Sequence, residues 1–363
     1  MIKKLKELPF TSYHPSYEFL AFYRIFFSLF LLWMGVSDYS WISDIPNSAM
    51  LPPISPLSFV ESIPPKWFFV ACKYIMYACL LLILIGFRPR IFAIVFMVTV
   101  LITNNYAYSF GKINHNFIYT LPILIMAFSP WNHTYSFFPE PKKETDVLSR
   151  SWPIFLISML FGFGMFTAGF AKYLGGWLSL DTQYSQIFFY RYRYGFEWNK
   201  LLSDFYDTIP YPLFWEFFDY FTVLFEVAFI VAFLKPKYFR FMLLLTLLFH
   251  LNVLFMLNIS FSFAMGLYAL FIPADLLPEG FKNGVKKIFR SIFQPRYKWG
   301  GIVFVILYII LIAKFNLNLV GFLPGRIVTL LPITNEYMLS IIVIGFSFLL
   351  ALYLFIRSFK KAY

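Results

Sequence analysis

Charged residues are scarce in this sequence of 363 residues: Asp, Glu, Lys and Arg make up 13%, whereas hydrophobic residues make up 60%. Soluble domains carry about 25% charged residues. With roughly half of that share, the chain cannot cover a globule with polar side chains. A water-soluble globule and a disordered chain are therefore both excluded, and lipid must replace water around most of the chain.

Cysteine and histidine are scarce as well, with two and four residues. Cys72 and Cys79 are seven residues apart in one apolar run, and on a helix this spacing gives about 10 Å of rise, too far for a disulfide. No His-x3-His or Glu-x2-His spacing occurs, so we expect no metal site. Walker, GxGxxG and GxSxG motifs are also missing.

Long apolar runs are what the sequence contains instead. They are 15–22 residues long, which fits membrane-spanning helices and not the alternating strands of about ten residues that build an outer-membrane barrel. We predict an all-α, polytopic integral membrane bundle of about ten helices, in which one of the two shortest could be re-entrant. The predicted helices cover residues 17–37, 67–87, 90–106, 115–130, 153–174, 214–234, 239–258, 261–277, 299–315 and 337–356.

The basic residues indicate how these helices are oriented. With the N-terminus in the cytoplasm, the inner segments hold 20 of the 30 Lys and Arg and the outer segments hold seven. This positive-inside bias predicts that both termini are cytoplasmic, in what we expect to be a bacterial inner membrane. It also explains the net charge of +12 without nucleic acid, and the basic stretch YRYRYGFEW falls outside the cytoplasm.

Three parts of the chain follow from this topology. We expect a membrane core over 1–277, a basic cytoplasmic linker over 278–298 and two additional C-terminal helices over 299–363. The linker has an amphipathic pattern suited to the inner membrane surface. Of the outer loops, 38–66 is proline-rich and predicted to be extended, whereas 175–213 is aromatic and charged.

Ionisable residues in or at the ends of apolar runs each cost about 2.5–3.5 kcal/mol on insertion scales, and four of them stand out. They are His115, Lys172, Glu226 and His250. The topology places His115, Lys172 and His250 so that they can converge on one cavity in the outer leaflet. Plainer roles stay open for each: Lys172 can snorkel, His115 can cap its helix, His250 can bond across helices, and Glu226 is expected to pair with a buried cation or histidine.

Such a cavity suits proton transfer from a lipid-soluble ring. Burial weakens the hold of a lysine on its proton, so that the neutral amine can act as a base. An aromatic-walled pocket beside it would accept a quinone. The small residues Gly162, Gly164, Ala168 and Gly169 allow either a close helix neighbour or a flat ligand. His14 and His133 lie in polar segments and carry no signal.

The order of these residues resembles a known family. An N-terminal helix carries Arg24, the pair Asn114-His115 opens a helix, the motif AGxxK ends at Lys172, and Glu226 precedes a helix with Phe249-His250. This series is similar to the membrane domain of vitamin K-dependent gamma-carboxylase and its bacterial relatives, the horizontally transferred transmembrane domain proteins. The resemblance covers about residues 19–277.

The resemblance implies a mechanism. Lys172 would deprotonate a hydroquinone, either vitamin K hydroquinone or a menaquinol-like one. Its oxygenation to an epoxide would drive the modification of a peptide or small substrate, and His115 would act in the carboxylation half-reaction. Asn114, His250, Glu226 and Gly169 would line or support the cofactor pocket.

The chain departs from that family in one respect. The animal enzyme has a large soluble luminal domain, and this chain has only two outer loops and two extra helices, which puts carboxylation itself in doubt. Bacterial relatives of this size include proteins of the sporulation-delaying protein B type, associated with secreted peptide toxins. The alternative function is therefore a non-enzymatic accessory protein for toxin maturation or immunity, in which loop 175–213 binds a peptide. A transporter is less favoured because no inverted repeat is visible.

Overall fold

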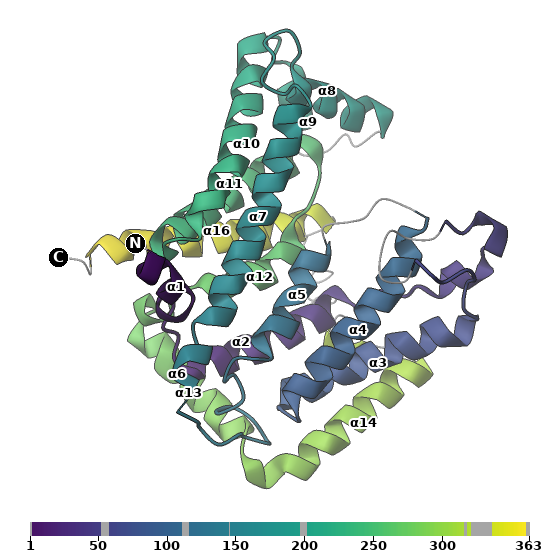
Figure 1. The fold of residues 1–363 in the computed structure, drawn as a ribbon, viewed down its shortest axis with the longest axis vertical. Helices are drawn as coiled ribbons and strands as arrows, with labels where there is room; N and C mark the ends of the chain where they lie inside the picture. Colours follow the sequence, from purple (N-terminus) through teal and green to yellow (C-terminus); the bar gives the residue numbers. More distant parts are fainter. Residues whose placement is uncertain are drawn as a thin grey trace. The chain divides into compact units, whose positions relative to one another are not determined.

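The computed structural model describes residues 2–51, 58–110, 116–144, 146–196, 202–315, 318–320 and 336–360. All regular structure in these ranges is helical, so the predicted all-α class is confirmed (Figure 1). In the described ranges, seven helices are long and apolar enough to cross a membrane, which makes the chain a multi-pass membrane protein. They are α2 (Tyr17–Met34), α3 (Lys66–Ile85), α4 (Pro89–Tyr108), α7 (Trp152–Leu174), α11 (Pro236–Leu257), α14 (Lys298–Phe315) and α16 (Glu336–Lys360).

Helix α10 (Pro212–Ala232) is as long as these spans but carries three acidic residues. The count of about ten membrane helices and the cytoplasmic termini stay predictions. The two shortest predicted helices are shorter still in the structure. Helix α5 (Asn116–Met126) has 11 residues with Pro122 inside it. The run 262–271 is broken into single turns around α12 (Met265–Tyr268), and it ends before Pro273 because a residue that precedes proline avoids the helical region.

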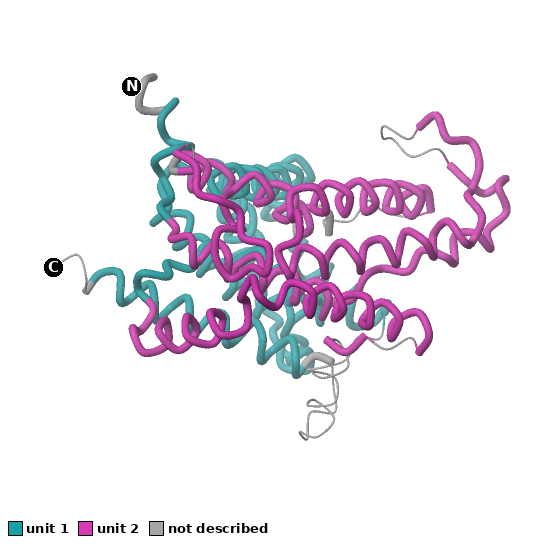
Figure 2. Tube along the Cα trace, turned by 90° about the horizontal axis from the view of Figure 1, so that it is seen from below, with its two compact units in different colours: residues 1–14, 154–276, 331–363 teal, residues 15–153, 277–330 magenta. Residues whose placement is uncertain are grey.

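The chain divides into two compact units (Figure 2). Unit 1 contains residues 1–14, 154–276 and 331–363, and unit 2 contains 15–153 and 277–330. Helix α16 packs on α11 in unit 1, whereas α14 packs on α3 in unit 2. Each C-terminal helix thus contacts a helix of the predicted core, and the division at residues 277 and 298 stays a prediction. The smaller helices are α1 (Ile2–Thr11), α6 (Asp146–Ser149), α8 (Tyr184–Tyr190), α9 (Ser203–Asp207) and α13 (Glu279–Ile292).

A buried arginine holds unit 2 together at one end of α3. Arg24 of α2 is completely buried, and its guanidinium donates hydrogen bonds to the carbonyl oxygens of Ile83 (2.6 Å), Leu84 (3.1 Å) and Tyr135 (2.5 Å). The first two carbonyls belong to the last turn of α3, where no i+4 amide within the helix can reach them, and that of Ile83 also accepts from the Gly86 amide at 3.0 Å. A cation there also compensates the negative end of the helix dipole. All three partners of the Arg24 guanidinium thus lie outside its own helix.

The glycine at the end of α3, Gly86, is required by its backbone conformation and by its close neighbours. Gly86 follows the helix with φ of +81°, and a Cβ atom there would lie 2.0 Å from Ser136 Oγ. The side-chain amide of Asn132 donates to the Gly86 carbonyl at 3.1 Å. Any other residue would therefore separate α3 from the segment that Arg24 also binds.

The proline-rich segment 38–66 differs from the expected extended chain. Its described part forms short 3₁₀ helices at Ser40–Asp44 and Asn47–Ala49. Ile42 is fully buried against Phe69 and Tyr106. Burying this apolar side chain folds the segment onto α3 and α4 instead of leaving it extended.

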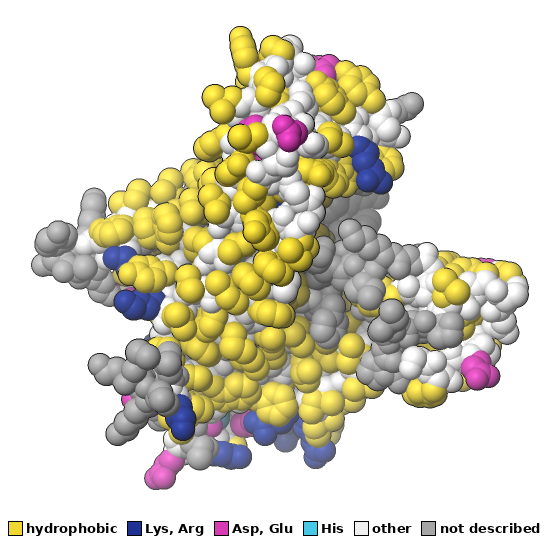
Figure 3. Space-filling model, turned by 45° about the horizontal axis from the view of Figure 1, so that its top comes forward, with side chains coloured by type: hydrophobic (Ala, Val, Ile, Leu, Met, Phe, Trp, Pro, Cys, Tyr) yellow, Lys and Arg dark blue, Asp and Glu magenta, His cyan; other side chains and the backbone are white. Residues whose placement is uncertain are grey.

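The surface is largely hydrophobic, as the composition predicts. On the face drawn in Figure 3, hydrophobic side chains cover most of the described surface, and Lys and Arg gather in a few small groups. The cysteines, which are both free, are buried.

Candidate functional site

The central feature of unit 1 is an ion pair between two long helices. Lys172 in the last turn of α7 contacts Glu226 in α10, with 2.5 Å between Nζ and Oε2. The side chain of Glu226 is 7% exposed and that of Lys172 is 25% exposed. The expectation that Glu226 pairs with a cation is confirmed, and the structure joins two of the predicted site residues directly.

Two glycines allow α7 and α10 to approach closely enough for this pair. A Cβ atom on Gly169 would lie 2.7 Å from Glu226 Cβ and 2.9 Å from the Val227 backbone nitrogen, and one on Gly162 would lie 3.0 Å from the Phe229 carbonyl oxygen. The glycines are seven residues apart, which is two helical turns, so both lie on the same face of α7. The structure therefore places Gly169 in the helix–helix contact.

We predict that Gly169→Ala lowers the free energy of unfolding by about 1–3 kcal/mol, because the added methyl group must push α10 away. Gly345→Ala is the matched control: that glycine lies in α16 with nothing within 4 Å of its ideal Cβ, and alanine there should be neutral or stabilising by up to about 1 kcal/mol. Denaturation of the purified protein in SDS titrations measures both. Equal stability of the two variants would contradict the packing role.

The chain after Lys172 folds back over the lysine. Helix α7 ends in a Schellman motif, in which the Trp177 amide donates to the Lys172 carbonyl (3.2 Å) and the Gly176 amide to the Tyr173 carbonyl (3.1 Å), with Gly176 at φ of +83°. This turn brings the Trp177 ring 5.6 Å from Lys172 Nζ. Trp177 also stacks on Tyr184, with 5.6 Å between centroids and 8° between planes. The turn at Gly175 and Gly176 thus positions the stacked rings of Trp177 and Tyr184 beside the ion pair.

Two acidic residues of α10 bind the segment that follows this turn, at residues 183–185. Asp219 accepts hydrogen bonds from the backbone amides of Tyr184 (2.7 Å) and Ser185 (2.8 Å), so it caps the first turn of α8 from another helix. Glu216 accepts from the Gln183 side chain at 2.8 Å. Both acidic residues are buried.

The sequence-based search missed Glu216 and Asp219. The available signal was their spacing: with Glu226 they occupy positions i, i+3 and i+10, which is one face of a helix. That face of α10 therefore carries all three of its acidic residues, and it faces both Lys172 and the segment that covers it.

His250 belongs to a different group of side chains. It is buried in α11, where its Nε2 contacts the Tyr268 hydroxyl at 2.9 Å and its ring stacks on Phe261, with 4.3 Å between centroids. Its described contacts therefore lead to Tyr268 and Phe261, and those of Lys172 lead to Glu226 and Trp177. His115 and Asn114 lie outside the described residues, so their predicted place beside Lys172 stays a prediction.

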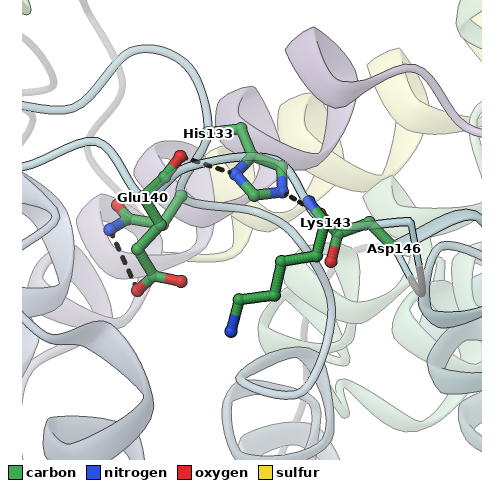
Figure 4. Close-up of polar contacts among 5 residues, drawn as sticks. His133, Glu140, Lys143 and Asp146 are labelled. Carbon is green, nitrogen blue, oxygen red and sulfur yellow. Dashed lines mark hydrogen bonds and ion pairs between the residues drawn. The ribbon is translucent and has the colours of Figure 1, made fainter.

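A second titratable cluster lies in unit 2, around the histidine that we expected to carry no signal. Figure 4 shows His133 between two acceptors: Nδ1 is 2.8 Å from the Glu140 carbonyl oxygen and Nε2 is 2.7 Å from Asp146 Oδ2. The backbone amide of Lys143 donates to the same Asp146 oxygen at 2.6 Å. The ring of His133 thus bridges a backbone carbonyl and a carboxylate that also accepts a backbone amide. The contacts close the loop between residues 133 and 146.

Among the described residues, no three His, Cys, Asp or Glu side chains lie together in a way that could hold a metal ion. The comparisons with protein-family models, curated proteins and solved structures found no match. The resemblance to the gamma-carboxylase family therefore rests on the order of residues in the sequence.

Proposed function

We propose that the chain is a multi-pass membrane enzyme that removes a proton from a hydroquinone at the Lys172–Glu226 pair. A hydroquinone bound there would supply, on oxygenation by O₂, the driving force to modify a peptide or small substrate at the outer leaflet. The observation that carries this proposal is the titratable pair itself, held between α7 and α10 against the ring of Trp177. Ionisable pairs inside membrane helices generally mark proton or substrate pathways.

The chemistry of the pair supports this role. In a medium of low dielectric constant the charged and neutral forms of a lysine–carboxylate pair are close in energy, because desolvation disfavours both charges. A proton moved from Nζ to Glu226 leaves a neutral amine, which is the base that the reaction needs. Nζ and Oε2 are in direct contact, so a proton can pass between them without a bridging water. Glu226 then holds the proton while Lys172 takes the next one from the hydroxyl group of the ring.

The surroundings fit a lipid-soluble ring. Phe170 and Tyr173 are 44% and 54% exposed and contact each other on other faces of α7, so an aromatic ring that arrives through the bilayer meets aromatic side chains on this helix. Next to the lysine itself, Trp177 and Tyr184 offer flat faces. The bound hydroquinone would supply the reducing equivalents. His115 and Asn114 are proposed for the second half-reaction, and the His250–Tyr268 pair for support.

The topology supports an outer-leaflet reaction. With both termini in the cytoplasm, as the basic residues predict, α7 starts after the basic segment 142–150, and its last turn, with Lys172, lies on the outer side. We place the protein in a bacterial inner membrane, where substrates reach loop 175–213 from outside.

Mass spectrometry of the purified protein tests the cofactor. From quinone-replete cells, we expect a bound naphthoquinone, and Trp177→Ala should retain about 5- to 150-fold less, because a stacked ring contributes about 1–3 kcal/mol of binding. Trp299→Ala is the control, since that exposed tryptophan lies at the start of α14. A wild-type protein without bound quinone, or equal retention in both variants, would contradict the quinol site.

A further inference from the structure

We infer that α13 and the start of α14 form a binding surface for anionic phospholipid headgroups, independent of the reaction proposed above. We call the exposed part of residues 279–299 the lipid-facing surface. None of the side chains of α13 is buried, although the helix has 14 residues. A helix of a folded unit that buries none of its side chains must have a partner for its apolar face other than the unit itself.

Helix α13 has three faces, as its periodicity of 3.6 residues requires. One face holds it to unit 2: Phe289 contacts Phe22 and Tyr135, with ring centroids 5.8 and 5.5 Å apart. Phe293, just after the helix, contacts Phe137 at 5.1 Å. These contacts come from α2 and from the segment before α6, so α13 is fixed on the unit and cannot turn its other faces inward.

The second face is apolar and exposed. Phe281, Ile288 and Ile292 are 55%, 58% and 49% exposed, and their spacing of seven and four residues puts them in one stripe. If water surrounds these large apolar side chains, the several kcal/mol of free energy that their burial would contribute is not gained. The stripe continues past the helix with Tyr297 and Trp299, which are 47% and 72% exposed. Exposed tyrosine and tryptophan at the beginning of a membrane span are typical of the interface.

The third face is basic. Lys287 and Arg290 on the helix and Arg296 and Lys298 after it are exposed. Glu279, the acidic residue of α13, is already paired with Lys282 at 2.6 Å. An apolar stripe bordered by cations that outnumber the acids complements a membrane surface that carries negative charge, and the positive-inside count places this segment on the cytoplasmic side. Arg296 and Lys298 lie at the beginning of the membrane span that contains α14. They are therefore expected at the depth of the lipid headgroups.

The first test locates the apolar stripe. The cysteines of the chain, Cys72 and Cys79, are buried, so an environment-sensitive fluorophore can be attached selectively at Ile288→Cys or, as the control on the polar face, at Asn283→Cys. In nanodiscs of equimolar phosphatidylcholine and phosphatidylglycerol, we expect the label at 288 to emit at shorter wavelength and to be several-fold less quenched by iodide. Equal quenching at both positions in the nanodiscs would overturn the inference.

The second test concerns the charge. We expect the full-length protein, titrated in mild detergent and followed by native mass spectrometry, to bind phosphatidylglycerol more tightly than phosphatidylcholine. Lys287→Glu with Arg296→Glu should weaken phosphatidylglycerol binding by about tenfold or more, because each basic residue near the surface contributes about a fivefold factor. Lys66→Glu with Arg191→Glu changes the net charge equally elsewhere and should preserve it. An equal loss in both double variants would show that only overall charge matters and would contradict a defined surface.

Discussion

Lys172→Arg is expected to abolish quinol-dependent turnover while leaving the protein folded. Arginine keeps the positive charge and can still pair with Glu226, but it does not release its proton in the physiological range. If Lys172 acts as the base, the rate should fall by about 10²- to 10⁴-fold, the usual contribution of a positioned acid–base group. The measurement is the loss of a reduced naphthoquinone and the formation of its epoxide, with oxygen uptake recorded in parallel.

Lys172→Ala should reduce turnover to the same extent but also lower stability. It leaves Glu226, with 7% of its side chain exposed, without its cation. The comparison of the two variants therefore separates proton transfer from structure: only the alanine variant loses stability, whereas both lose activity. Lys314→Ala is the matched control, because Lys314 also lies in the last turn of a membrane span and contacts an aromatic ring, that of Phe315 at 5.5 Å. Normal turnover in Lys172→Arg would contradict the assignment of Lys172 as the base.

The same variants decide between the enzyme and the accessory protein. If the chain only binds a secreted peptide, Lys172→Arg is silent and replacement of the aromatic segment 178–196 eliminates function. The structure gives that segment a defined attachment, because the Tyr220 hydroxyl donates to the Leu178 carbonyl at 2.9 Å and Asp219 caps α8. A replacement should therefore keep Leu178, Tyr184 and Ser185, so that a loss of function reflects the exposed side chains and not a detached loop.

The sequence predicts the helices well because a bilayer imposes a length and a composition on each of them. It also singles out Lys172 and Glu226, since an ionisable residue in an apolar run needs a partner. Gly162 and Gly169 lie on the face of α7 that contacts α10, but their spacing does not name that neighbour, so the pairing of Lys172 with Glu226 comes from the structure. Local composition and periodicity are sufficient for the helices and for singling out the two residues.

What the sequence could not predict are contacts made where periodicity stops. Asp219 reaches α8 only because the Schellman turn after α7 reverses the chain, and the direction of that turn depends on packing against α10. His133 and Asp146 meet across a loop with no repeating pattern. The short helices in 38–66 form for a similar reason, because Ile42 finds a buried site between two helices that are distant in the sequence.

Arg24→Leu is expected to cost the largest part of the stability of unit 2, about 4 kcal/mol. Leucine leaves the Leu84 and Tyr135 carbonyl groups buried without the guanidinium donor, whereas the Ile83 carbonyl keeps the Gly86 amide as a donor at 3.0 Å. Each unpaired buried carbonyl costs about 1–3 kcal/mol. The loss is less than the sum because the buried guanidinium is itself costly to desolvate. Since its contacts join α2, the end of α3 and the segment before α6, the variant should also unfold less cooperatively.

Two further variants make this prediction specific. Arg24→Lys carries a point charge with no planar fork and cannot reach three carbonyls at once, so we expect about half of the loss. Arg90→Leu is the control: Arg90 is exposed and donates one hydrogen bond, to the Ala127 carbonyl at 3.2 Å, so its removal should cost less than about 1 kcal/mol. SDS titration followed by circular dichroism measures all three. Equal stability of Arg24→Leu and Arg90→Leu would show that water reaches the end of α3 and satisfies the carbonyl groups there, which would contradict a dry, arginine-capped junction in this unit.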